Sequence, residues 1–307
     1  MNNSYNFSIE DIRKAIDKSG YVFELQLCPI FEKFGFITYS CAQFQDQDTG
    51  KSRELDIEAV DDVMINDIDD VTLITDRLSV RVVAECKNNS SPLILFTRQP
   101  YLGHYAEPLI CGNPEFLKDV EGIPSGGLFY ITDYLKFEEF HHNWKFTHPA
   151  YQFGLMKPKF ISKGTHNEVV DWSITHDDYY ESINKLTKAC FSKGIDAYKK
   201  SQHFIINEIY LELIYPILIL SGDIYECRVE QESYSLNKIE RTILQWETKS
   251  ASIKHFFNID IVTGAYLQNY LELIKKEVAE IKKRIVSDLQ FIKNSVLKDG
   301  QTILINA

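Results

Sequence analysis

The sequence predicts an α/β fold in which a mixed sheet is combined with helices near both ends of the chain. Two stretches rich in β-branched and apolar residues, 53–59 and 80–87, show the period-two alternation of strands. An apolar stretch over 21–33 precedes them and has the composition of a helix. Near the C-terminus, apolar residues recur every three or four positions over 267–296, which predicts a long amphipathic helix.

The composition predicts a folded protein without a strongly basic surface. The 307 residues are 44% hydrophobic and 25% charged, enough apolar material for one large domain or two ordinary ones. The formal net charge is −11, whereas proteins that coat nucleic acid carry a basic surface. This balance argues against non-specific coating of nucleic acid, but not against an enzyme whose positive charge is confined to one site.

The sequence predicts a cytoplasmic protein with no membrane contact. The first residues lack the basic start and apolar run of a signal peptide. The longest apolar cluster, 211–220, is interrupted by Glu212 and Pro216 and is too short to cross a bilayer. The six cysteines are scattered and form no Cys-x-x-Cys pair, so we expect reduced thiols rather than disulfides or a cysteine zinc site.

Two short helices are predicted at the N-terminus. Ser8 is in an N-cap position, and Asp11 is placed to close a capping box. Ile9, Ile12 and Ile16 form an apolar stripe that predicts a buried helix face. The pair 19–20, Ser-Gly, interrupts this helix before the second one over 21–33, which Pro29 must kink or end.

Three strands are predicted next. A strand over 34–41 is joined by a turn at 46–50 to the strand over 53–59. In that second strand one face carries the apolar residues Leu55, Ile57 and Ala59, and the other carries Glu54, Asp56 and Glu58. After an acidic stretch over 61–76, which we interpret as a solvated loop or strand edge, the strand over 80–87 places Val83, Glu85 and Lys87 on one face.

The polar end of this last strand allows two interpretations. Glu85 and Lys87 follow an apolar run, where neither charge is tolerated without a partner. They form either a structural ion pair at a strand end or part of a site for a hard metal ion. In the second case Asp56 on the neighbouring strand supplies a further oxygen ligand.

A third acidic residue, Glu24 in the second helix, precedes these two strands in an otherwise apolar segment. With this order of residues the chain resembles the PD-(D/E)XK nuclease superfamily, which has the restriction-endonuclease-like fold. Leu55-Asp56 matches the Pro-Asp element with Leu in place of Pro, Glu85-Cys86-Lys87 matches the (D/E)XK element, and Glu24 matches the acidic residue of the first helix. The resemblance covers about the first hundred residues.

The resemblance implies a metal-dependent nuclease that hydrolyses phosphodiester bonds, in the first place a DNA endonuclease, with a role in antiviral or other genome defence. It implies that Asp56, Glu85 and the main-chain carbonyl of Cys86 hold Mg²⁺, for which Mn²⁺ can substitute. Lys87 would position or activate water, and Glu24 would bind a second metal ion or orient the first ligands. Arg53 and Arg81 either touch phosphate or lie on the surface.

Two other functions remain open at this stage. One is a catalytically silent, nuclease-like interaction protein that assembles through its C-terminal helix. The other is an RNA-directed nuclease with the same chemistry. Asp, Glu and Lys at every position of the motif argue against the silent protein, and the acidic net charge argues for it.

We expect four segments. Residues 1–100 form the first part of the nuclease core, 101–172 an aromatic, loop-rich insertion, 173–230 a helix and strands that complete the core, and 231–307 a strand and the long C-terminal helix. The segment before 231 is expected to contain a helix over 177–200 with Tyr180, Ile183, Leu186 and Cys190 on one face. A β-rich piece of three parts follows over 205–214, 215–220 and 224–229, and its second and third parts are expected to form a hairpin.

The insertion contains aromatic and basic residues whose role is open. Rings near Lys136 and Lys145 either stack on unpaired bases or form a small satellite core, and the core is favoured. Substrate contacts are possible for a group just after the predicted site: Arg98, Tyr101, His104 and Tyr105. A zinc site of His141, His142 and His148 is disfavoured because adjacent residues point apart and no cysteine joins them.

The C-terminal helix over 265–298 carries a heptad seam, formed by Leu267, Leu271, Ile274, Val278, Ile281 and Ile285. This seam packs either on the core of the same chain or against a second copy, which would give a homodimer. Its basic residues, which include Lys275, Lys282 and Arg284, are expected to form a solvated face rather than a strip that contacts DNA.

Overall fold

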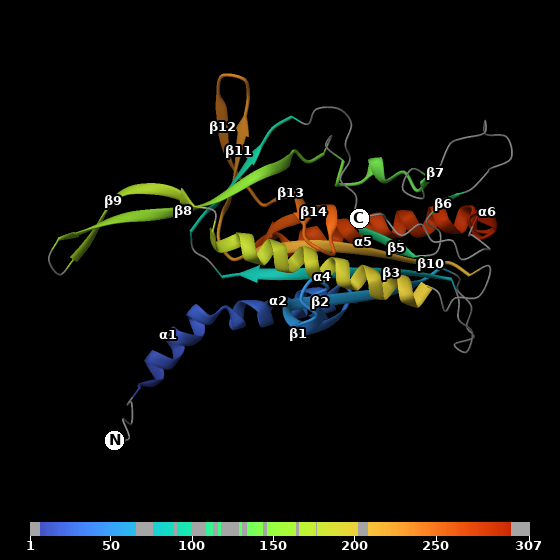
Figure 1. Cartoon of the computed structure of the whole chain (residues 1–307), viewed down its shortest axis with the longest axis horizontal. Coiled ribbons are helices and arrows are strands. Elements are labelled where there is room, and N and C mark those ends of the chain that lie inside the picture. The colour runs from blue at the N-terminus through green and yellow to red at the C-terminus, as the bar shows by residue number, and fades with distance from the viewer. Residues whose placement is uncertain are drawn as a thin grey trace.

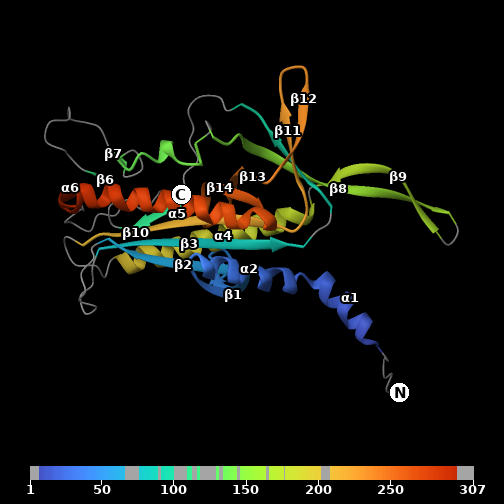
Figure 2. The same ribbon diagram turned by 180° about the vertical axis from the view of Figure 1, so that it is seen from behind.

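The protein is described here from a computed structural model. The residues that it describes are 7–65, 76–88, 91–99, 109–112, 116–117, 129–130, 134–143, 146–163, 166–175, 177–201 and 208–295. One large mixed sheet forms the centre of the molecule, and helices cover both of its faces (Figure 1). Helix α4 lies on one face, and α2 and α5 lie on the other, as the view from behind shows (Figure 2).

The N-terminal helices are α1 (Ile9–Ser19) and α2 (Tyr21–Lys33). The predicted capping box of Ser8 and Asp11 is confirmed. Gly20 separates the helices with a φ of 84°, a left-handed conformation that glycine adopts without strain. Pro29 lies inside α2 and does not end it, because the helix continues to Lys33.

The expected buried stripe of α1 is wrong. Ile9, Ile12 and Ile16 are 72%, 43% and 44% exposed, and α1 contains no buried residue. The helix extends away from the body of the molecule, so its apolar stripe has no sheet beneath it (Figure 1). Periodicity showed which side chains share a face, but it could not show whether anything packs on that face.

The first half of the sheet is an antiparallel meander followed by parallel strands. Its strands are β1 (Ile37–Gln45), β2 (Ser52–Met64), β3 (Arg77–Lys87), β10 (Tyr210–Leu220) and β14 (Lys254–Thr263), in that spatial order. Strand β10 is parallel to β3 along its whole length, from Tyr210 opposite Arg77 to Leu220 opposite Lys87. Helix α4 (Asp177–Ser201) precedes β10 and packs on β10 and β3. Parallel neighbours need such a crossover, because a tight turn cannot join them.

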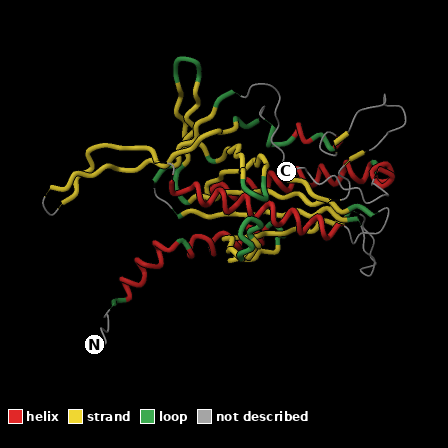
Figure 3. The backbone as a smooth tube through the Cα atoms, in the orientation of Figure 1, coloured by secondary structure: helices red, strands yellow, loops and turns green. Residues whose placement is uncertain are grey.

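The second half of the sheet follows β14. Its spatial order is β13 (Arg241–Lys249), β8 (Pro149–Lys163), β4 (Leu93–Thr97), β11 (Ile224–Val229) and β12 (Tyr234–Ile239). Strand β9 (His166–Thr175) pairs with β8, and these two extend beyond the body as an arm (Figure 3). Two strand pairs are small: β5 (Leu109–Gly112) pairs with β10, and β6 (Phe116–Leu117) pairs with β7 (Phe129–Tyr130).

The expected hairpin between 215–220 and 224–229 is wrong. Strand β10 is an interior strand that pairs with β3 and β14, whereas β11 pairs with β4 and forms its hairpin with β12. The Ser-Gly-Asp link at 221–223 therefore carries the chain from one half of the sheet to the other. Turn residues between two apolar runs are typical of a hairpin, but they do not fix the strand partner.

The predicted loop-rich character of 101–172 also needs correction. Strand β8 has 15 residues and belongs to the main sheet, where it pairs with β4, β9 and β13. Pro149, Gly154 and Pro158 lie within β8 and obscured its strand pattern, since both residue types usually mark turns. Strands β12 and β13 were likewise not expected in 231–307, where one strand before the helix was predicted.

The long C-terminal helix is confirmed as α5 (Leu267–Ser287), followed after Asp288 by α6 (Leu289–Ser295). All six seam residues from Leu267 to Ile285 are buried in the core cluster on this face of the sheet. The seam therefore packs within the chain. Short 3-10 turns occur at η1 (Phe137–Glu139) and η2 (Gly264–Tyr266).

Each face of the sheet has its own apolar core. Side chains of α2 and α5 pack on one face, and those of α4 pack on the other. On α4, Ile183, Leu186 and Cys190 are buried as expected, but Tyr180 is 53% exposed and Tyr179 takes the buried position. No helix in the described ranges is long and apolar enough to span a bilayer.

Candidate functional site

The two strand carboxylates of the predicted site lie where β2 and β3 separate. Pairing between these strands ends at Ile57 opposite Ala84, one residue before Asp56 and Glu85. The main-chain N–H of Cys86 donates to Asp56 Oδ2 at 2.7 Å, so the aspartate satisfies a donor in the region where the β2–β3 pairing has ended. The carboxylates of Asp56 and Glu85 consequently face α4.

The predicted faces of β2 are wrong for Leu55, which lies just beyond the point where the β2–β3 pairing ends. Leu55 packs in the core under α4, whereas Ile57 and Ala59 pack in the core under α2 and α5. A strict alternation would place all three on one face. The backbone change around Asp56 moves Leu55 to the other side and presents the aspartate beside Glu85.

Glu85 is the most deeply buried acid of the site. Its side chain is 0% exposed, and burial, followed by the negative charge of Asp56, raises its pKa to about 7. Lys185 Nζ lies 2.6 Å from Glu85 Oε1. Among the described residues Glu85 Oε2 has no hydrogen-bond partner, which is costly for a buried carboxylate.

Lys185 on α4 is the site residue that the sequence did not reveal. Its Nζ lies 2.6 Å from Glu85 Oε1 and 3.4 Å from Asp56 Oδ1, so one ammonium bridges the two carboxylates. These carboxylates raise the pKa of Lys185, although its partial burial acts in the opposite direction. The contact with Asp56 spans 129 positions in sequence, and no local pattern could have indicated it.

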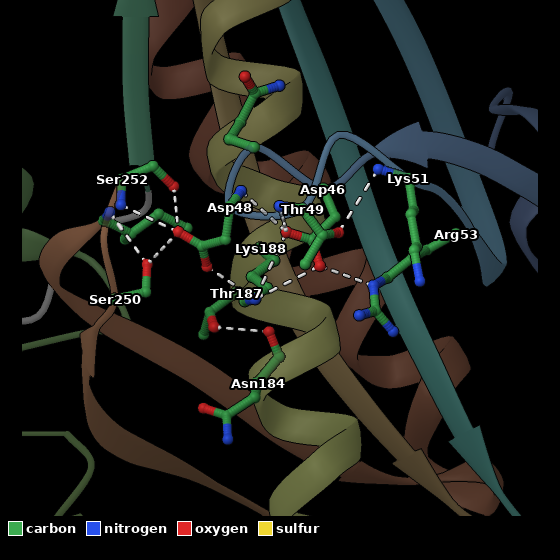
Figure 4. Close-up of polar contacts among 12 residues, drawn as sticks. Asp46, Asp48, Thr49, Lys51, Arg53, Asn184, Thr187, Lys188, Ser250 and Ser252 are labelled. Atoms are coloured by element: carbon green, nitrogen blue, oxygen red, sulfur yellow. Dashed lines mark hydrogen bonds and ion pairs between the residues drawn. The ribbon is translucent and has the colours of Figure 1, made fainter.

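A second lysine fixes α4 beside the meander. Lys188 Nζ lies 2.7 Å from Asp48 Oδ2 and 3.3 Å from Asp46 Oδ2 in the turn between β1 and β2 (Figure 4). The hydrogen bond from Lys188 holds the pKa of Asp48 well below its usual range. Asp48 also accepts hydrogen bonds from Ser250 and Ser252, so this turn joins α4 to the β13–β14 connection. These contacts restrain the helix segment that carries Lys185.

The two flanking arginines have structural partners. Arg53 Nε lies 2.6 Å from Asp46 Oδ2 in the same turn. Arg81 is buried and forms ion pairs with Glu58 and Glu212. Lys193 of α4 completes this network, with its Nζ 2.7 Å from Glu58 Oε2. Arg81 therefore lies neither on the surface nor at a position that phosphate can reach.

Glu24 and Lys87 lie at the edge of the site. Glu24, in the first turn of α2, is half-buried, and its pKa is raised by burial and then by the charge of Asp56, while Lys185 and Lys87 lower it. Lys87 also lowers the pKa of Glu85 electrostatically. Asn88, the next residue, donates to the carbonyl of Asp17, which docks the α1–α2 junction against the end of β3.

The site therefore combines three carboxylates and two lysines. Glu24, Asp56 and Glu85 provide oxygen ligands of the type that Mg²⁺ prefers. The Lys185 ammonium shows that a cation fits between Asp56 and Glu85, and Glu85 Oε2, which has no hydrogen-bond partner in the described part of the chain, offers a further ligand atom. The residues present thus fit a divalent metal ion. The Cys86 thiol takes no part, because it is buried in the core on the opposite face.

The two adjacent histidines of the aromatic insertion also differ from expectation. His141 and His142 do not point apart: their ring centroids are 3.9 Å apart, and both rings contact Asp260. Phe137 and Phe140 are buried in the core, which agrees with the favoured interpretation of the aromatic residues.

Several other expected contacts of this region can be placed only in part. Arg98 lies over the ring of Tyr151, at 4.8 Å from its centroid. Tyr101, His104, Tyr105 and Lys145 lie outside the described residues.

Comparison with known proteins does not extend this picture. No protein-family model, curated protein or solved structure matches the chain.

Proposed function

We propose that this protein is a metal-dependent nuclease that hydrolyses phosphodiester bonds, with DNA as its first expected substrate. The observation that carries the proposal is the placement of Asp56 and Glu85 on adjacent strands, where pairing ends, with the Lys185 ammonium bridging them. Two buried or half-buried acids converge on one ammonium here, and among the described residues Glu85 Oε2 still has no hydrogen-bond partner, so the lysine alone does not satisfy the group.

The order of elements supports a restriction-endonuclease-like core. Helix α2, the β1–β2–β3 meander, helix α4 and strand β10 parallel to β3 come in this order along the chain, with β4 to β9 inserted between β3 and α4, and they pack together. This is the helix, hairpin and third strand that the resemblance requires, followed by a later helix and a fourth strand. Lys87, at the end of β3, is near enough to lower the pKa of both Glu24 and Glu85 electrostatically.

In this proposal Asp56, Glu85 and the main-chain carbonyl of Cys86 hold Mg²⁺, for which Mn²⁺ can substitute. The bound ion would act as a Lewis acid on the phosphoryl oxygen and lower the pKa of a water molecule. Lys87 donates to that water or to a phosphate oxygen and stabilises negative charge there. Glu24 is placed to accept a hydrogen bond from water at the edge of the site or to hold a second ion.

Lys185 has a different role because it contacts the carboxylates themselves. Its ammonium holds the Asp56 and Glu85 carboxylates in place before a metal ion enters, and it lowers the pKa of Glu85 against the larger opposite effect of burial. The local positive charge of Lys87 and Lys185 also offsets the acidity of the whole chain at the point where a phosphate would approach.

The experiment is a paired measurement of metal binding and cleavage. Mn²⁺ and Mg²⁺ are titrated calorimetrically into wild type and Asp56→Asn, and the same proteins are incubated with plasmid DNA, single-stranded DNA and RNA. Asp171→Asn, an exposed acid on β9, is the matched control. We expect binding and metal-dependent cleavage in wild type and the control, and neither in Asp56→Asn.

The alternatives give other results. Cleavage of RNA alone would identify the RNA-directed nuclease. Metal binding without cleavage of any substrate would favour the silent interaction protein. Equal metal binding by wild type and Asp56→Asn would reject Asp56 as a ligand.

A further inference from the structure

A second group of possible metal ligands lies on the other face of the sheet. His141 and His142 come from the segment between η1 and β8, and Asp260 comes from β14. The three residues are 3%, 4% and 1% exposed. His141 Nε2 lies 3.3 Å from Asp260 Oδ1, and His142 Nε2 lies 2.9 Å from Asp260 Oδ2. One ligand atom from each residue lies within 4.8 Å of the others.

The hydrogen bonds of His141 define which ring nitrogen carries its proton. Glu277 of α5 accepts the main-chain N–H of His141 at 2.7 Å with one oxygen and faces the ring Nδ1 at 2.7 Å with the other. An ionised carboxylate can only accept, so Nδ1 carries hydrogen. In a neutral ring, Nε2 then presents a lone pair.

That lone pair faces another acceptor. His141 Nε2 points to Asp260 Oδ1 and, within the described part of the chain, has no hydrogen-bond partner. Asp260 Oδ2 already receives the Tyr270 hydroxyl at 2.8 Å and faces His142 at 2.9 Å. A buried lone pair opposite a buried carboxylate is repulsive unless a proton or a metal ion lies between them.

The surroundings of the cluster fit a metal ion. Asp260 and Glu277 are both buried, and their ion pairs to described residues involve only the two histidines. A divalent ion among these groups would supply the positive charge that buried carboxylates need.

We propose that His141, His142 and Asp260 bind one structural zinc ion. Two imidazole nitrogens and a carboxylate form a donor set typical of zinc rather than of Mg²⁺. Ligand atoms about 2.0–2.1 Å from zinc in a tetrahedral arrangement lie about 3.3–3.4 Å apart. The histidine nitrogens lie 3.3 and 2.9 Å from the two Asp260 oxygens, and the ligand atoms of the three residues all lie within 4.8 Å of one another. Glu277 holds the His141 ring in orientation, as carboxylates commonly do for zinc-bound histidines.

The role of this ion is structural because all three ligands are buried. It joins the segment after η1 to β14, and through Glu277 to α5. The Tyr270 hydroxyl or a water molecule would complete four-fold coordination. The inference does not depend on the proposed nuclease activity, since the two sites lie on opposite faces of the sheet.

The test uses the full chain without an affinity tag, dialysed against metal-free buffer, and measures bound metal by plasma mass spectrometry. We expect about one zinc ion per chain. His142→Gln and Asp260→Asn should lose it. His148→Gln, which changes a half-buried histidine outside the cluster, and Asp56→Asn at the other site should retain it.

A second measurement, made on the wild-type protein, keeps the proposal testable if the variants do not fold. X-ray absorption of the wild-type protein should show zinc bound by two imidazoles and oxygen donors; sulfur ligands would overturn the proposal. It is also overturned if wild type contains no zinc and neither Zn²⁺ nor a chelator changes its unfolding temperature, because protons then fill the site. Zinc that persists in both His142→Gln and Asp260→Asn would place the ion elsewhere.

Discussion

Lys185 Nζ and Glu85 Oε1 are 2.6 Å apart, which places a helix-borne cation against a fully buried carboxylate of the central sheet. The same ammonium reaches Asp56. It therefore contacts the oxygens that a metal ion would need, and the lysine and the metal compete for one position. This competition makes the interpretation of the site testable without knowledge of the substrate.

Lys185→Met should lower the free energy of unfolding of the metal-free protein and raise its affinity for metal ions. Removal of the ammonium leaves Glu85 and Asp56 without their shared partner, at a cost of about 2 kcal/mol in the free energy of unfolding. Mn²⁺ should then bind more tightly, by about tenfold, since no cation has to be displaced. Urea unfolding and calorimetric titration measure the two effects. Lys199→Met, an exposed change on the same helix, should alter neither, and weaker metal binding by Lys185→Met would contradict the competition.

Metal binding should depend on pH through Glu85. Burial, followed by the charge of Asp56, raises the pKa of Glu85 to about 7, so below this pH a metal ion must displace a proton. We expect the Mn²⁺ affinity to fall about tenfold per pH unit below this pKa and to level off above it. Titrations over this range measure the slope. A slope that persisted unchanged in Glu85→Gln would assign the proton to another group.

The stability of the metal-free protein should fall as the pH rises through this range, whereas the metal affinity should rise. Because the folded-state pKa of Glu85 lies above the usual glutamate value of 4.5, the folded protein binds more protons than the unfolded chain between 4.5 and about 7. The contribution of Glu85 to stability is therefore present at acid pH and is lost as the pH rises through about 7. Glu85→Gln should remove this component from the pH dependence of urea unfolding.

Arg81→Leu should destabilise the fold strongly. The change leaves Glu58 and Glu212 buried without their main cation, with an expected loss of about 3–5 kcal/mol in the free energy of unfolding. Chemical denaturation measures this loss. Lys238→Met, which breaks an exposed ion pair with Asp223, is the control and should leave the denaturation midpoint nearly unchanged. A small effect of Arg81→Leu would show that the network relaxes around the missing charge.

The exposed stripe of α1 should tolerate polar residues. Ile12→Asn and Ile16→Asn change side chains that contact no core, so we expect the unfolding temperature to stay the same. Leu271→Ala in the buried seam of α5 should cost about 2–5 kcal/mol. Thermal unfolding of the three variants compares the buried apolar face of α5 with the exposed apolar stripe of α1.

Local patterns predicted local structure well. The capping box at Ser8, the strands around Asp56 and Glu85, and the α5 seam were all recognised, because each depends on residues within a few turns or one strand. The same periodicity failed for α1. It measures the separation of apolar and polar faces, and α1 separates them although its apolar face packs on no core.

Partners distant in sequence could not be predicted. Lys185 reached the site only through the crossover of α4, and His141 and Asp260 met only because β14 lies beside β10 and under α5. The argument that adjacent histidines point apart holds for a regular strand, but His141 and His142 lie in a turn after η1. The hairpin error at 221–223 has the same origin, since strand partners are set by the whole sheet.

The pairing of β3 with β10 has a consequence for synthesis of the chain. Strand β3 and its carboxylate leave the ribosome well before α4 and β10, which supply its counter-ion and its second neighbour. Until then β3 is an edge strand that exposes apolar side chains and unpaired backbone groups. Contacts of such long sequence separation also form slowly. The nascent chain therefore passes through a period in which β3 is open to aggregation or to chaperones, and the site assembles only after residue 220 has emerged.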